Sequence, residues 1–145
     1  MTTINFSENI IAGIVSSILT FIFVLLRDRY KYWRLFHKLA GKYRHYDIHG
    51  QPLLDGLTEI SYLGKNLLKT KGKSSEGEWV GRIMMNEALP EYGSGIYQYV
   101  GRDDCGVHQI QVHPSAESIY VLGQNTSHGN NFSFSYLWRR DEKAS

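Results

Sequence analysis

The side chains best suited to chemistry in this chain are arginines and aromatic rings, which recur through its last two thirds. Guanidinium groups bind phosphates through paired hydrogen bonds, and aromatic rings stack on planar bases. Asparagine and glutamine amides could read the edges of those bases. Taken singly, each such aromatic residue is better explained as core and each arginine as solvated surface. The candidate ligand-binding residues are Arg44, Tyr46, Trp79, Arg82, Asn86, Tyr97, Tyr99, Tyr136 and Arg139, with Arg102, Tyr120 and Gln98 as further candidates, while Trp138 is expected in the core.

Catalytic motifs are missing from the sequence. It has no Gly-x-Ser-x-Gly, no P-loop, no Gly-x-Gly-x-x-Gly and no His-Glu-x-x-His. The six histidines show no metal-ligand spacing, and Cys105 is the single cysteine, with no base evident beside it. We therefore expect a binding protein rather than an enzyme, without a metal site or a cofactor.

Residues 10–26 form an apolar run without charge or proline, which predicts one transmembrane helix. At about 1.5 Å per residue the run is about 25 Å long, slightly shorter than a hydrocarbon core of about 30 Å. Arg27 and Arg29 follow the run, whereas Glu8 is the only charged side chain in the leader at 1–9. A signal peptide has its positive charge before the apolar run. The positive-inside rule places the leader outside and the C-terminal domain in the cytoplasm.

One face of the predicted span carries small residues. Gly13, Ser16, Ser17 and Thr20 recur at helical spacing. Such a stripe lets two helices approach closely, with hydroxyl hydrogen bonds across the contact, and would support a homo-oligomer. The same hydroxyls could instead bond to carbonyls of their own helix. Both interpretations are open from the sequence.

The helix is expected to continue through residues 27–40 as a juxtamembrane segment. Arg27, Lys31, Arg34 and Lys38 make a basic stripe, with aromatic residues on other faces. This composition is typical of an interfacial segment, and a stalk packed on the next domain would explain it equally well. The net charge of the chain is only +2, so this cluster suits anionic lipid headgroups better than a DNA or RNA duplex.

From residue 41 the apolar period changes from helical to alternating, and turn residues separate the alternating segments. Alternation is clearest at 132–139, where aromatic residues alternate with serine, leucine and arginine. The predicted fold class is an N-terminal transmembrane helix followed by an all-β, eight-stranded antiparallel barrel at 41–140, with a tail at 141–145. A two-sheet sandwich is the alternative. The expected strands are 41–48, 57–63, 66–71, 79–86, 95–100, 107–112, 118–122 and 132–139.

The first and last expected strands resemble those of calycins and lipocalins. Those barrels open with Gly-x-Trp after a short helix, and an arginine of a late strand stacks on the tryptophan. Here Gly41 and Tyr43 occupy the opening motif, and Arg139 and Arg140 follow Trp138. The resemblance implies that Tyr43 lies under Arg139 or Arg140 in a cation–π contact, with tyrosine in place of tryptophan.

A membrane helix followed by a small barrel resembles the β-barrel membrane effectors of bacterial antiphage defence, found in CBASS and Panoptes-type systems. In that family the barrel binds a cyclic dinucleotide, and the membrane segments assemble and damage the inner membrane. The resemblance implies a bacterial inner-membrane protein whose partners are a cyclic dinucleotide or cyclic oligonucleotide and the lipid bilayer. That family usually has two membrane helices, whereas this chain has one. The alternatives are a tethered carrier of a lipid or hydrophobic ligand, and a scaffold for a protein partner.

Overall fold

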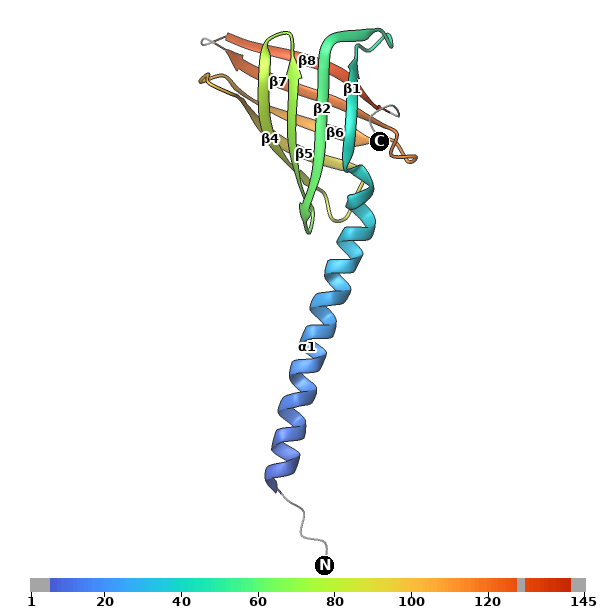
Figure 1. Cartoon of the computed structure of the whole chain (residues 1–145), viewed down its shortest axis with the longest axis vertical. Coiled ribbons are helices and arrows are strands. Elements are labelled where there is room, and N and C mark those ends of the chain that lie inside the picture. The colour runs from blue at the N-terminus through green and yellow to red at the C-terminus, as the bar shows by residue number, and fades with distance from the viewer. Residues whose placement is uncertain (1–5, 128–129, 142–145) are drawn as a thin grey trace, which may run out of the picture.

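The computed structural model describes residues 6–127 and 130–141, and it contains one long helix joined to one barrel (Figure 1). The helix α1 spans Phe6–Phe36, and a short 3-10 helix, η1, spans His37–Leu39. The predicted fold class, an apolar helix followed by an eight-stranded antiparallel barrel, is confirmed. The strands are β1 Gly41–Tyr46, β2 Pro52–Gly64, β3 Leu67–Ser74, β4 Gly77–Met85, β5 Tyr92–Tyr99, β6 Cys105–Val112, β7 Ser118–Ser127 and β8 Asn130–Arg140.

Parts of the two expected terminal segments lie outside the described residues. These are residues 1–5 of the expected leader and 142–145 of the expected tail. The remainder of the leader belongs to α1, which begins at Phe6. The expected juxtamembrane segment continues α1 without a break and then tightens into η1 just before the barrel.

The eight strands run up and down and close on themselves, because β1 pairs with both β2 and β8. Closure leaves no unpaired strand edge, and the sandwich alternative is therefore wrong. Successive strands run in opposite directions, and β1 starts beside α1. Every second connection therefore lies at the end of the barrel far from α1, namely β1–β2, β3–β4, β5–β6 and β7–β8. We call that end the mouth and the α1 end the base.

Six strands extend further toward the mouth than the sequence predicted, and the extensions of β2 and β7 are the longest, at five residues each. β2 begins at Pro52 instead of 57, because proline is tolerated as the first residue of a strand and the turn-rich composition concealed the extension. β7 continues to Ser127 instead of ending at 122, because its polar end pairs with β8, placing Asn125 opposite Phe132. Both extensions lengthen the walls of the mouth.

The apolar part of α1 has the length and composition of a membrane span, and the barrel buries none of it. A signal sequence at the same place would have the same properties. Phe21 and Phe23, for example, are 64% and 68% exposed. An apolar surface of this extent requires a bilayer or a partner to cover it.

The hydroxyls of the small-residue stripe bond within α1. Ser17 donates to the carbonyl of Gly13 at 2.8 Å, and Thr20 donates to the carbonyl of Ser16 at 2.9 Å. Local back-bonding therefore satisfies these hydroxyls in the single chain. No side chain stands within 4 Å of the point where a Cβ of Gly13 would lie, so the stripe keeps an open surface. Self-association through it stays a prediction.

Apolar packing closes the base of the barrel. Phe36 at the end of α1 and Leu39 of η1 are buried and reach the barrel interior. Inward-facing residues of six strands surround them, and none of these is more than 7% exposed. The interior is filled at this end, and its remaining space lies toward the mouth. The packed set is Tyr43, Ile60, Leu68, Ile83, Met85, Ile110, Val112, Ile119, Val121 and, from the β6–β7 connection, Ala116.

Arg140 ties the last strand to the helix–barrel junction. Its guanidinium carbon lies 5.3 Å from the centre of the Tyr43 ring, which is the cation–π contact that the calycin resemblance implied. The guanidinium also donates to the Tyr43 hydroxyl at 3.0 Å, to the carbonyl of Ala40 at 3.2 Å and to that of Lys38. Tyr43 in turn donates to the carbonyl of Leu39 at 2.9 Å.

Replacing Arg140 with alanine is expected to destabilise the barrel by about 1–3 kcal/mol, because it leaves partly buried acceptors at the junction without a donor. The matched control is Arg139→Ala, since Arg139 is exposed and stacks on Tyr46 outside the barrel at 4.8 Å. An exposed contact of this kind contributes about 0.5–1 kcal/mol. Urea unfolding of the full chain in detergent, followed by tryptophan fluorescence, measures both values. Equal losses in the two variants would contradict the assigned role of Arg140.

Candidate functional site

The mouth of the barrel contains a cavity of about 740 Å³. Small-molecule sites have volumes of roughly 300–1,000 Å³. All eight strands contribute to its walls, and its aromatic lining comes from β4, β5 and β8, whose inward side chains alternate with outward ones. The aromatic residues that line the cavity are Trp79, Tyr97, Tyr99, Phe132, Phe134, Tyr136 and Trp138.

These rings form a continuous wall. Trp79 stacks on Trp138 with ring centres 6.1 Å apart and meets Tyr97 edge-on at 5.7 Å. Phe134 stacks on Tyr136 at 5.1 Å. Offset and edge-to-face contacts of this kind hold aromatic rings in place. The wall therefore presents flat, apolar faces to the interior of the mouth.

Glycines on neighbouring strands make room for the rings. A Cβ atom at any of three inward-facing glycines would overlap the ring that lies across from it. A larger residue there would push the ring into the cavity or force the strands apart. The glycine–aromatic pairs in register are Gly72 with Trp79, Gly106 with Tyr97 and Gly123 with Phe134.

Three polar atoms of the cavity wall have no hydrogen-bond partner among the residues that the structure describes. They are Nε2 of His108, Oδ1 of Asn125 and Nε1 of Trp138. The three residues are 3%, 8% and 3% exposed. A buried polar atom without a partner costs about 1–3 kcal/mol, and native proteins contain few of them. Their concentration in one cavity gives its wall unused capacity to form hydrogen bonds with a molecule inside it.

Comparisons of the chain with protein-family models, curated proteins and solved structures find no match. The geometry of the cavity is therefore the basis for its chemistry. Within residues 6–127 and 130–141, no three histidine, cysteine or acidic side chains gather as ligands of a metal ion would. The cavity offers aromatic faces, one buried amide, two indoles, two imidazoles and the hydroxyls of tyrosine and serine side chains.

The two imidazoles are uncharged at neutral pH. Burial lowers the pKa of His45 and of His108 to about 4. His45 has a partner, because its Nε2 lies 2.6 Å from the hydroxyl of Thr58. His108 stacks on Tyr97 with ring centres 5.6 Å apart. A neutral imidazole can donate or accept through Nε2, according to its tautomer.

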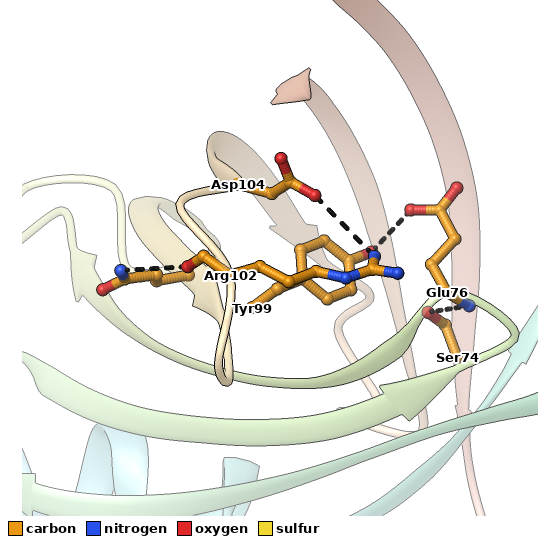
Figure 2. A network of polar contacts seen from close by, with 6 residues as sticks. Ser74, Glu76, Tyr99, Arg102 and Asp104 are labelled. Carbon is orange, nitrogen blue, oxygen red and sulfur yellow. Dashed lines mark hydrogen bonds and ion pairs between the residues drawn. The ribbon is translucent and has the colours of Figure 1, made fainter. Parts of the chain in front are cut away.

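A polar network crosses the rim of the mouth, from the β3–β4 turn to the β5–β6 loop (Figure 2). The guanidinium of Arg102 lies 3.7 Å from the carboxylate of Asp104, with its carbon 5.8 Å from the centre of the Tyr99 ring. Tyr99 donates its hydroxyl hydrogen to Glu76 at 3.0 Å. In the described part of the chain, Arg102 is the only arginine or lysine that lines the cavity. Positive charge is thus confined to the rim, where two acids flank it.

Four of the nine predicted ligand-binding residues line the cavity. They are the aromatic residues of β4, β5 and β8 that alternate onto the inner face. Of the further candidates, Arg102 lies at the rim, whereas Tyr120 and Gln98 are exposed on the outer face. The four are Trp79, Tyr97, Tyr99 and Tyr136.

The other five predicted residues do not line the cavity. Arg44 pairs with Asp141 at 3.2 Å, on the outer face of β1. Arg139 stacks on Tyr46 outside the barrel. Arg82 is exposed on the outer face of β4, and the side chain of Asn86 accepts hydrogen bonds from the β4–β5 loop backbone at 2.9 and 3.1 Å. The structure does not bring these arginines to the aromatic wall.

Several cavity residues were not among the predicted ligand-binding residues. Asn125 falls on the inner face because β7 continues past the expected end, keeping the alternation of Ile119, Val121 and Gly123. That regular spacing was the feature of the sequence from which the inward position of Asn125 could have been predicted. His45 and His108 lie between outward residues in the same way, but a histidine in a strand does not by itself indicate a site. Trp138, expected as core, is buried and also lines the cavity.

Proposed function

We propose that this chain is a membrane-anchored receptor whose barrel mouth binds a planar ligand with a polar edge, namely the base of a cyclic dinucleotide. The observation that carries the proposal is the set of unpartnered polar atoms of His108, Asn125 and Trp138 between aromatic walls. A nucleobase has two flat faces for stacking and an edge of donors and acceptors. An indole N–H donor, an amide oxygen acceptor and a neutral imidazole match such an edge.

The distribution of charged side chains in the cavity supports recognition of the base of the ligand rather than of its phosphates. The cavity interior has no arginine or lysine in the described chain, and both of its histidines are neutral. Ligand phosphates would stay at the rim, where Arg102 lies. The guanidinium of Arg102 could exchange its 3.7 Å contact with Asp104 for a phosphate oxygen.

The effector role follows from the resemblance to antiphage membrane effectors together with α1. The helix would anchor the chain in a bacterial inner membrane with the barrel in the cytoplasm. Ligand binding would bring chains together, and α1 would associate through the stripe that begins at Gly13. Assembled helices would then disrupt the bilayer. The exposed apolar surface of α1 and the open small-residue face support this reading.

A carrier of a lipid or other hydrophobic ligand is the second candidate, and the aromatic wall favours it. A hydrocarbon chain would leave the polar atoms of His108, Asn125 and Trp138 unsatisfied. For this reason the nucleotide receptor is preferred.

We expect the full chain in dye-loaded liposomes to bind a cyclic dinucleotide and to release the dye when it does. Because Trp79 and Trp138 line the cavity, binding should change the intrinsic tryptophan fluorescence. The titration uses a panel of cyclic dinucleotides and cyclic oligoadenylates, with linear dinucleotides and a fatty acid for comparison. A response to the fatty acid alone would support the carrier. Binding without dye release would retain the receptor and reject the effector, and no response to any nucleotide would reject both.

A further inference from the structure

The hairpin between β2 and β3 reaches from the base of the barrel down beside α1. Figure 1 shows its tip beside the upper part of the helix. Tyr62, at the end of β2, packs against the base core that includes Phe36 and Leu39. The positive charge of Arg29 acts on the Tyr62 phenol, opposing the rise in its pKa that burial causes. The hairpin tip, residues 63–66, therefore lies close to the segment of α1 that follows the apolar run.

That segment of α1 falls in the headgroup layer if the apolar run spans the membrane. The run is about 25 Å long in a hydrocarbon core of about 30 Å, so the core extends about 2–3 Å past each end. Each polar layer adds about 5–8 Å, which places its outer boundary about 7–11 Å beyond Leu26. Tyr32 lies six residues, or about 9 Å, along the helix from Leu26. The barrel base contacts α1 at this level, because Tyr32 donates to Glu87 of the β4–β5 loop at 2.7 Å.

The tip of the β2–β3 hairpin has the side chains that a lipid surface binds. Leu63 is 51% exposed, and no residue of the described chain covers its apolar surface fully. Lys65 is exposed at the turn itself, with a φ of 47°. The hairpin from 61 to 70 contains no acidic residue, whereas the β4–β5 loop carries Glu87 and Glu91. Of these two segments of the base, only the β2–β3 tip combines apolar and purely positive character.

We propose that this hairpin tip is a second membrane contact, in which Leu63 enters the headgroup layer and Lys65 binds lipid phosphates. The contact rests on the proposed membrane span of α1. Two attachments, one by the helix and one by the hairpin, fix the tilt of the barrel relative to the bilayer. The mouth, at the opposite end, then faces the aqueous phase and stays accessible to a soluble ligand.

The depth of single labelled cysteines tests the contact in the full chain. Cys105→Ser removes the native thiol, which is exposed. Leu63→Cys then places an environment-sensitive fluorophore at the tip, and Leu54→Cys is the matched control on the same strand, at a site that is 88% exposed. The two positions are nine residues apart in β2, or about 30 Å. Ile18→Cys, within the apolar run, reports whether α1 spans the membrane.

The measurement is quenching by nitroxide headgroup lipids in vesicles of phosphatidylethanolamine and phosphatidylglycerol. We expect quenching of the Leu63 label to be several-fold stronger than that of the Leu54 label, and Lys65→Glu to weaken it. Equal quenching of the two labels, with the Ile18 label shielded from an aqueous quencher, would overturn the hairpin contact alone. An Ile18 label accessible to the aqueous quencher would overturn the membrane span and the contact with it.

Discussion

Replacing Asn125 with leucine is expected to raise the free energy of unfolding of the barrel by about 1–3 kcal/mol and to weaken cyclic dinucleotide binding by roughly tenfold or more. Oδ1 of Asn125 is buried without a partner in the described chain, so removing it removes a desolvation cost. The neighbouring cavity has space for the branched side chain. The same change deletes the amide that the proposed base would bind.

The opposite signs of the two effects make this variant diagnostic. A residue with a purely structural role would lose stability when replaced, and ligand binding would fall only as a consequence. Gln124→Leu is the matched control, because Gln124 is the preceding residue of β7 and is exposed on the outer face. Surface changes of this kind usually alter stability by less than about 0.5 kcal/mol.

Urea unfolding and fluorescence titration of the same full-length preparations measure both quantities for Asn125→Leu. If the variant is less stable than the wild type, a partner for Oδ1 exists and the cavity is not missing a ligand there. If it is more stable but binds the nucleotide normally, the base does not contact Asn125.

Acidification from pH 7 to pH 5 is expected to destabilise the barrel by about 2 kcal/mol for each of its two buried histidines. Burial lowers the pKa of His45 and of His108 to about 4, whereas an unfolded histidine titrates near 6.5. Between these values the unfolded chain binds more protons than the native barrel, so stability rises with pH. The contribution of each buried histidine to the free energy of unfolding is fully present above the unfolded pKa. It is lost as the pH falls from about 6.5 toward 4.

Urea unfolding at several pH values between 7 and 5 measures this slope, in a range where carboxylates add little. His108→Gln should reduce the slope by about half, since one of the two buried imidazoles is removed. Adding His45→Gln should remove most of the remainder. A wild-type stability that does not change over this range would show that both histidines remain accessible to protons in the folded state.

The unpartnered atoms of the site lower the stability of the empty barrel, and below about pH 6.5 its buried histidines lower that stability further. Both costs concentrate at the mouth, while the base is packed with apolar residues and joined by Arg140. A ligand that completes the hydrogen bonds of the mouth would therefore stabilise the protein, as any ligand specific for the native state does. Thermal unfolding with and without the nucleotide provides a direct check on the titration.

The sequence alone determined the helix, the number of strands and the face on which most strand residues lie. These features depend on local periodicity, such as the apolar run at 10–26 and the alternation at 132–139. The alternation of 79–86 already separates Trp79 from Arg82, and the structure keeps them on opposite faces of β4. The resemblance to calycins also placed Tyr43 under Arg139 or Arg140, and the structure shows that Arg140 makes the contact.

Only the tertiary structure decided which residues meet at the mouth. His108, Asn125 and Trp138 come from β6, β7 and β8, and whether each finds a partner depends on neighbours supplied by other strands. The pairing of each cavity ring with a glycine depends on strand register, which no local pattern specifies. Barrel closure left Arg44, Arg82 and Arg139 outside, because an unpaired guanidinium is costly to bury while an aromatic ring gains from burial.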